Sequence, residues 1–191
     1  MKAFTHWLLI GALTVPLTLV SELTATAAPA QVVLIRHGEK PDEGNELNAK
    51  GWQRANALPQ FFNNNAVVKA FGLPVAIYAM EPSDDDGSVR AIQTVTPLAK
   101  SLGLEIQSKY SKKEIKPLVD EILSNASYDN HMVLICWEHK MIPKIVRQFG
   151  WDNAPDWDGS VFDRAWVLNF TGNAVTQFQN IPQHLLPGDS D

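Results

Sequence analysis

The sequence predicts an α/β fold: a three-layer α/β/α sandwich with a mostly parallel sheet and an antiparallel edge. Three observations support this prediction. Short apolar runs alternate with amphipathic segments, these runs are continuous rather than alternately polar, and the last two strand-like runs flank a tight turn. A length of 191 residues and a hydrophobic content of 45% suit one domain with a substantial core.

The first 27 residues are expected to be a cleaved export signal and not part of the fold. Lys2 provides the positive start, and the apolar stretch 7–20 is short for a membrane span. Pro16 argues against a retained anchor helix, and Ala25-Thr26-Ala27 fits the small-x-small cleavage pattern. The domain is therefore expected to span residues 28–191 in a periplasmic or secreted protein, with no stable membrane insertion after cleavage.

Four parallel strands are expected where apolar runs lead from one amphipathic segment to the next. These runs are residues 32–36, 75–80, 104–107 and 131–137. The intervening amphipathic segments predict four helices, at residues 49–62, 88–102, 112–123 and 139–149. Such alternation is typical of a parallel sheet covered by helices on both faces.

Residues with known capping preferences mark several of these boundaries. Asn48 is a plausible N-cap for the first helix, and Ser88 for the second. In the last helix, Pro143 is tolerated only in the first turn, and Gly150 suits a left-handed C-terminal cap. The segments 164–170 and 174–179 flank Thr171-Gly172-Asn173, a pattern that predicts a β-hairpin at the antiparallel edge.

The first strand runs directly into Arg36-His37, and the strand 131–137 runs into Glu138-His139. In open α/β sheets ligands bind beyond the carboxyl ends of the strands, so both histidines are expected at one edge. Arg90, at the start of the second helix, adds another cation.

This set of residue types suits phosphoryl transfer. An arginine fork binds two phosphate oxygens, and a neutral imidazole can attack phosphorus to form a phosphohistidine. Neighbouring cations favour the neutral imidazole, because they disfavour a second positive charge. Each residue alone also has a simpler interpretation: His37 as a structural residue at a strand end, and Arg90 as solvated or paired with the Asp84–Asp86 run.

Four segments together resemble the histidine phosphatase superfamily, also called the phosphoglycerate mutase-like family. They are LIRHGEK, LNAKGWQRANAL, SVRAIQTVTPLAKSLGL and VLICWEHKMI, in this order over about 140 residues. The resemblance implies a phosphoglycerate mutase-like fold in which His37 is the phosphorylated nucleophile. It also implies that Arg36, Arg90 and His139 complete the phosphate pocket, with no cofactor required.

Two departures from the family pattern leave the general acid open. Lys140 follows the second histidine where the family often has Gly, and the segment 81–87 replaces a short Ser-Pro link. The candidates for the acid that protonates the leaving oxygen are Glu138, Glu114, Glu81 and the Asp84–Asp86 run. Glu138, next to His139, has a second interpretation, as an orienting partner on the back of the sheet, because neighbouring strand residues alternate between faces.

The composition excludes several other classes of function. The net charge of −5 argues against a nucleic-acid partner, and a single cysteine, Cys136, excludes a disulfide framework or a multi-cysteine metal site. A metal at His37 and His139 would need a further ligand, and the arginines would repel the cation.

The function expected from the sequence is a metal-independent phosphohydrolase that acts on a phosphomonoester. The alternative is a phosphate- or anion-binding protein of the same fold with weak or no catalysis, and a mutase is a third option. The loops 81–87 and 151–160 are expected to form the rim of the pocket.

Overall fold

The computed structural model describes residues 28–82 and 87–190, so the predicted export signal and the Asp84–Asp86 run lie outside the described residues. The strands are β1 (Gln31–Arg36), β2 (Pro74–Ala79), β3 (Ile106–Gln107), β4 (Met132–Trp137), β5 (Arg164–Thr171) and β6 (Ala174–Pro182). The helices are α1 (Ala49–Asn64), α2 (Arg90–Leu102), α3 (Ile115–Ser124) and α4 (Ile142–Gln148), with a short 3₁₀ turn at Ala126–Tyr128.

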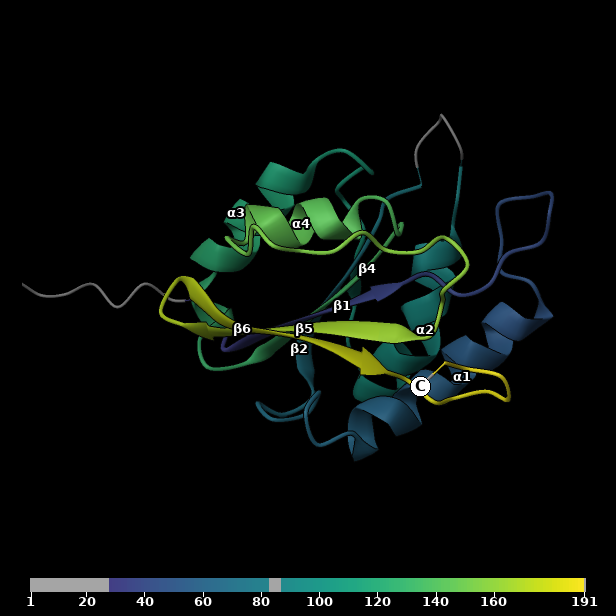
Figure 1. Ribbon diagram of the computed structural model, residues 1–191, viewed down its shortest axis with the longest axis horizontal. Coiled ribbons are helices and arrows are strands. Elements are labelled where there is room, and N and C mark those ends of the chain that lie inside the picture. Colours follow the sequence, from purple (N-terminus) through teal and green to yellow (C-terminus); the bar gives the residue numbers. More distant parts are fainter. Residues whose placement is uncertain (1–27, 83–86, 191) are drawn as a thin grey trace, which may run out of the picture.

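These elements form three layers. Figure 1 shows α1 and α2 packed together on one face of the sheet, with α3 and α4 on the other. The strand order is β3-β2-β4-β1-β5-β6. Strands β1 to β4 are mutually parallel where they pair, and β5 and β6 form the antiparallel edge. The predicted fold class is therefore confirmed.

The central strands β1 and β4 are buried along their whole length, because helices cover both faces of the sheet. Their aliphatic side chains, such as Leu34 and Ile135, have no exposed surface. Each such side chain stabilises the fold by about 1.5–3 kcal/mol. The strands that end at the two histidines are thus in the best-packed part of the molecule.

The cap predicted at Asn48 is confirmed, since its side chain accepts a hydrogen bond of 2.9 Å from the Gly51 N–H. The cap predicted at Ser88 is wrong. Helix α2 begins one residue later, its N-cap is Val89, and no side chain caps it. The Ser88 hydroxyl instead lies 3.3 Å from Arg90 Nη1, which donates to it.

The predicted start of the last helix at residue 139 is also wrong. Residues 139–141 form a turn, and α4 begins at Ile142 with Pro143 in its first turn. Proline has no N–H to donate, so it is accommodated where the helix has not yet closed its own hydrogen bonds. Gly150 follows the helix with φ of +101°, as predicted for a left-handed cap residue. Within the described residues, no helix is long and apolar enough to cross a membrane.

Candidate active site

Strands β1 and β4 are neighbours, and their parallel register pairs Arg36 with Trp137. The ladder continues one step further, because the His37 N–H donates to the Trp137 carbonyl at 3.1 Å. His139 follows Trp137 by two residues. Both histidines therefore lie beyond the same edge of the sheet, where a parallel sheet binds its ligands.

His37 is nearly enclosed, with 4% of its surface exposed. Its Nδ1 lies 2.8 Å from the Gly38 carbonyl oxygen, which can only accept, so Nδ1 carries the proton. The pKa of His37 is lowered to about 4, mainly by burial and also by the positive charges of Arg36 and Arg90, against the opposing effects of the Gly38 hydrogen bond and Glu138. At neutral pH the ring is uncharged and Nε2 keeps its lone pair.

Arg36 is buried beside His37 and held by backbone carbonyls. Its Nη1 donates to Gly159 at 2.8 Å and to Val161 at 2.9 Å, and its guanidinium lies 3.6 Å from the centre of the Phe162 ring. Burial lowers the pKa of Arg36 to about 10, and the charge of Glu138 opposes this effect. The side chain therefore stays cationic at neutral pH.

The carbonyls that bind Arg36 belong to one segment, Trp157–Phe162, which is called the strap below. The Trp157 indole donates to the Val161 carbonyl at 2.9 Å, and Asp158 accepts from the N–H and hydroxyl of Ser160. A Cβ atom at Gly159 would lie 3.2 Å from His139 Nε2. The strap therefore contacts Arg36 and His139 at once, and the loop expected at the rim does reach the site.

His139 is less completely bonded than His37. Its Nδ1 is 3.1 Å from Glu138 Oε1, but the geometry is not that of a hydrogen bond. Glu138 Oε2 lies 3.6 Å from Lys112 Nζ. Burial lowers the pKa of His139, followed by the charge of Arg36, while Glu138 raises it.

Arg90 lies close enough to His37 for its charge to lower the pKa of that ring. Its guanidinium donates to the carbonyls of Gly44 and Glu46 and to the hydroxyl of Ser88. The charge of Arg90 therefore acts on His37, while its N–H groups donate mainly to backbone carbonyls. The rival interpretation, a pair with Asp84–Asp86, involves a segment outside the described residues.

The three glutamates considered as general acids occupy different positions. Glu138 alone is in direct contact with a site histidine. It lies just beyond the end of β4, and its Oε1 is 3.1 Å from His139 Nδ1, a contact that also suits the role of an orienting partner. Glu114 is exposed, and hydrogen bonds from Ser111 lower its pKa, which disfavours an acid role. Among the described residues, no hydrogen bond or ion pair links Glu81 to either histidine.

Three buried polar atoms at this sheet edge lack a hydrogen-bond partner within the described part of the chain. They are Arg36 Nε, Glu138 Oε2 and His139 Nδ1. Buried polar groups are nearly always paired, and leaving one unpaired costs about 1–3 kcal/mol. A cluster of such atoms around a buried imidazole is typical of a site built for a polar ligand. Across residues 28–82 and 87–190, no group of three or more His, Cys, Asp or Glu side chains could hold a metal ion.

Sequence reasoning missed a second group of charged residues, behind His37. Glu39 and Arg54 are both buried, and Arg54 also binds Asp189 near the end of the chain. One signal could have revealed Arg54, since it falls on the same helical face as Gly51 and Leu58. A charged residue on an apolar face needs a buried partner.

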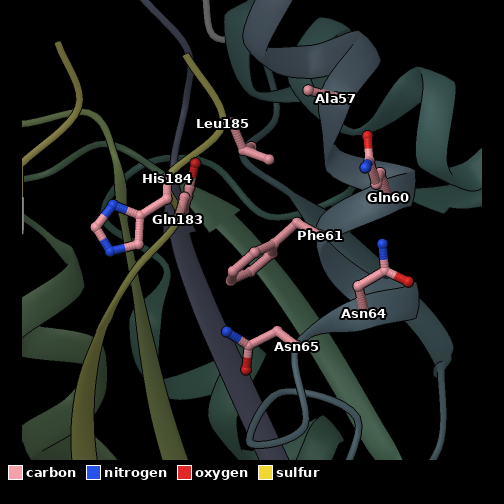
Figure 2. A pocket seen from close by; sticks show the side chains of 8 residues that line it. All are labelled: Ala57, Gln60, Phe61, Asn64, Asn65, Gln183, His184 and Leu185. Carbon is pink, nitrogen blue, oxygen red and sulfur yellow. The ribbon is translucent and has the colours of Figure 1, made fainter. Parts of the chain in front are cut away.

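A cavity of about 390 Å³ lies between α1 and the C-terminal segment, and none of the predicted site residues lines it. Figure 2 shows Gln183, His184 and Leu185 on one side, facing Phe61 and the amides of α1 on the other. Gln183 also accepts a hydrogen bond of 3.3 Å from Arg54 Nη1. The cavity therefore adjoins the buried charged group, not the sheet edge that holds the two histidines.

No protein-family model matches the sequence, and no curated protein does so either. The structure, in contrast, is similar to several solved structures. The protein histidine phosphatase SixA complexed with tungstate superimposes with a TM-score of 0.56 and 12% identity, covering 80% of this chain and 97% of SixA. A phosphoglycerate mutase from Bacillus anthracis gives a TM-score of 0.55 and 11% identity, with coverage of 83% and 94%.

The chain has the phosphoglycerate mutase-like fold. A mycobacterial glucosyl-3-phosphoglycerate phosphatase is also similar, with a TM-score of 0.50 and 11% identity over 80% of this chain and 97% of that one. At such identities the comparisons establish the fold that was predicted from the four motifs, and the chemistry must be argued from the residues themselves.

Proposed function

We propose that the protein is a metal-independent phosphohydrolase that transfers the phosphoryl group of a phosphomonoester to water through His37. The main support comes from the residues at the carboxyl ends of β1 and β4. A buried neutral imidazole presents a lone pair on Nε2, and at the same sheet edge Arg36 and His139 each have a buried polar atom without a hydrogen-bond partner in the described part of the chain. The fold supports the same function, since SixA, which shares it, is a protein histidine phosphatase complexed with tungstate, itself a tetrahedral oxyanion.

In the first step Nε2 of His37 forms a bond to phosphorus, and the bond from phosphorus to the ester oxygen breaks. The proton stays on Nδ1, which donates to the Gly38 carbonyl, so the phosphohistidine carries its positive charge on a ring that is already oriented. Arg36 and Arg90 stabilise the phosphoryl oxygens as charge rearranges. Preorganised donors of this kind supply much of the catalysis in phosphoryl transfer.

The leaving oxygen needs a proton, and the Glu138–His139 pair is the proposed source. A bound phosphoryl dianion raises the pKa of His139, since an opposite charge favours the imidazolium. Nδ1–H then turns to Glu138, and Nε2–H faces the substrate. In the second step water attacks the phosphohistidine, its proton passes to His139, and inorganic phosphate leaves with His37 neutral again.

Turnover of p-nitrophenyl phosphate tests this proposal. Activity is expected to persist when a chelator is present, and to fall by at least about a thousandfold in His37→Ala, since the covalent route is lost. His131→Ala is the matched control, because His131 is exposed and lies outside the site. Undiminished turnover in His37→Ala, or activity abolished by the chelator, would contradict the proposal.

A phosphate-binding protein without efficient catalysis is the second candidate, and one observation favours it. The donors of Arg90 and Arg36 Nη1 already bind backbone carbonyls, which leaves fewer of them for a transition state. Phosphate binding that requires His37 and Arg36 but yields no turnover would select this candidate. For either function we propose a location outside the cytoplasm, following the expected export signal.

A further inference from the structure

The buried charged group behind His37 joins three distant parts of the chain. Arg54 is 1% exposed and donates to Glu39 through Nη2 at 2.7 Å and through Nε at 3.1 and 3.2 Å. The same guanidinium binds both carboxylate oxygens of Asp189, at 2.7 and 2.9 Å. Arg54 thus connects the loop after the nucleophile to the C-terminal segment through helix α1.

Arg54 and Asp189 are both ionised. Burial alone would raise the pKa of Asp189, but hydrogen bonds from Arg54 and from the N–H groups of Leu186 and Leu185 lower it to about 2. Burial likewise opposes the charge on Arg54, yet hydrogen bonds to Asp189 and Glu39 raise its pKa above the ordinary value. Removing one partner from a buried ion pair is costly, since it leaves the other charge unpaired.

Glu39 matters for His37 because of the peptide bond between Gly38 and Glu39. The carbonyl of that peptide accepts the His37 Nδ1 proton. Anchors fix it on both sides: the Gly38 N–H donates to Thr94 Oγ1 at 2.8 Å, and the Glu39 carbonyl accepts from the Asn48 N–H at 3.0 Å. The Glu39 side chain, bound to Arg54, is the remaining anchor.

Helix α1 approaches this loop as closely as a backbone can. A Cβ atom at Gly51 would lie 2.3 Å from the Glu39 carbonyl oxygen and 2.9 Å from its nitrogen. Only glycine fits there without moving the backbone. Arg54 lies one turn further along α1. Its hydrogen bonds to Glu39 and the close contact at Gly51 therefore hold the loop after His37 against the same helix.

We propose that Arg54 is a positioning residue for His37, and that Asp189 holds Arg54 in place. Through Glu39, the pair fixes the Gly38 carbonyl that keeps the proton on Nδ1 and leaves Nε2 free to attack. The catalytic meaning of this role rests on the proposed function. The structural part does not, because the tautomer of His37 is measurable without a substrate.

Nuclear magnetic resonance of the protein with ¹⁵N-labelled histidine tests the inference, since long-range ¹H–¹⁵N correlations report the tautomer and pKa of each imidazole. The variants are Asp189→Asn and Arg54→Lys, which keeps the charge but loses the fork. The matched control is Asp120→Asn, which removes a carboxylate paired with Lys116 on the surface. Tyr78→Phe, which perturbs a buried hydrogen-bond network elsewhere, controls for loss of stability.

In the wild type and both controls, His37 is expected to hold its proton on Nδ1 and to titrate near pH 4. In Asp189→Asn and Arg54→Lys the proton is expected to be shared between both nitrogens. The kcat for p-nitrophenyl phosphate should then fall ten- to a hundredfold, as for one charge-assisted hydrogen bond, with KM within about twofold.

An unchanged His37 tautomer in a folded Asp189→Asn variant would overturn the inference, whatever happens to activity. A shifted tautomer in a protein that hydrolyses no phosphate ester would support the positioning role and reject the proposed function. If Arg54→Lys fails to fold, Asp189→Asn decides alone, with thermal melting to establish that it is native.

Discussion

His37 and His139 occupy equivalent places at the ends of adjacent parallel strands, yet their surroundings differ. His37 is 4% exposed, its Nδ1 is paired at 2.8 Å, and the loop behind it is anchored to α1 and the C-terminal segment. His139 is half-buried in a turn, and its Nδ1 lies near Glu138 without a hydrogen bond. In the proposed reaction His37 must hold one orientation throughout, whereas His139 must gain and lose a proton.

The two halves of the site are therefore suited to different tasks. In the proposed reaction, the His37 half of the site is bonded before substrate arrives, and the His139 half keeps unpartnered atoms for a charge that changes. Preorganisation reduces the cost of reaching the transition state, while an unpaired polar atom gains most when a ligand binds it.

The largest expected effect on turnover is that of replacing His139. His139→Ala removes the proposed proton donor to the leaving oxygen, and general acid–base catalysis contributes about 10²–10⁴ in rate. Stability should change little, because His139 makes no hydrogen bond through Nδ1 within the described chain. The measurements are kcat for p-nitrophenyl phosphate and the thermal midpoint, with the exposed His184→Ala as control; wild-type turnover would remove His139 from the site.

The second-largest expected effect is that of replacing Arg90, whose guanidinium donates to the backbone carbonyls of Gly44 and Glu46. If it turns to the phosphoryl group on binding, Arg90→Lys keeps the charge but loses the fork, and vanadate inhibition should weaken roughly ten- to a hundredfold. Arg147→Lys is the control, since Arg147 lies in α4 and donates to the Ala154 carbonyl at 3.0 Å. Inhibition unaltered in Arg90→Lys and Arg90→Ala would leave Arg90 with only a structural role, in holding residues 44–46.

The smallest expected effect comes from the strap. A methyl group at Gly159 would press on His139 Nε2 at 3.2 Å, so Gly159→Ala should lower kcat by roughly two- to fivefold, or about 0.5–1 kcal/mol. The test is a double-mutant cycle with His139→Ala. If the contact carries the effect, Gly159→Ala costs nothing further once His139 is absent; equal losses in both backgrounds would place its effect elsewhere.

The sequence was most informative about the reactive side chains that directly follow a strand. Continuous apolar runs placed β1 and β4, and the rule for parallel sheets placed Arg36, His37, Glu138 and His139 at one edge. These predictions depend on local pattern and on one general property of the fold. They need no knowledge of side-chain contacts.

The parts that could not be predicted depend on contacts between distant residues. Ser88 has the right side chain for a cap, but Val89 takes that position and the hydroxyl meets Arg90 instead. The bond between Arg54 and Asp189 spans 135 positions of sequence, and nothing local to either residue identifies the other. The rim loop 151–160 was expected at the site, but the binding of Arg36 by the strap carbonyls is a tertiary contact without a sequence motif.

The pairing of β1 with β4 also has a consequence for folding. The two histidines are about a hundred positions apart in sequence, and the ladder that aligns them is among the most non-local contacts of the chain. Such pairings form late, because closing a long loop costs entropy before any contact between its ends can stabilise the chain. A partly folded chain would therefore have helices and hairpins, but its two histidines would not yet lie at one sheet edge. Recovery of the proposed activity during refolding would mark completion of the central sheet, not an early compact state.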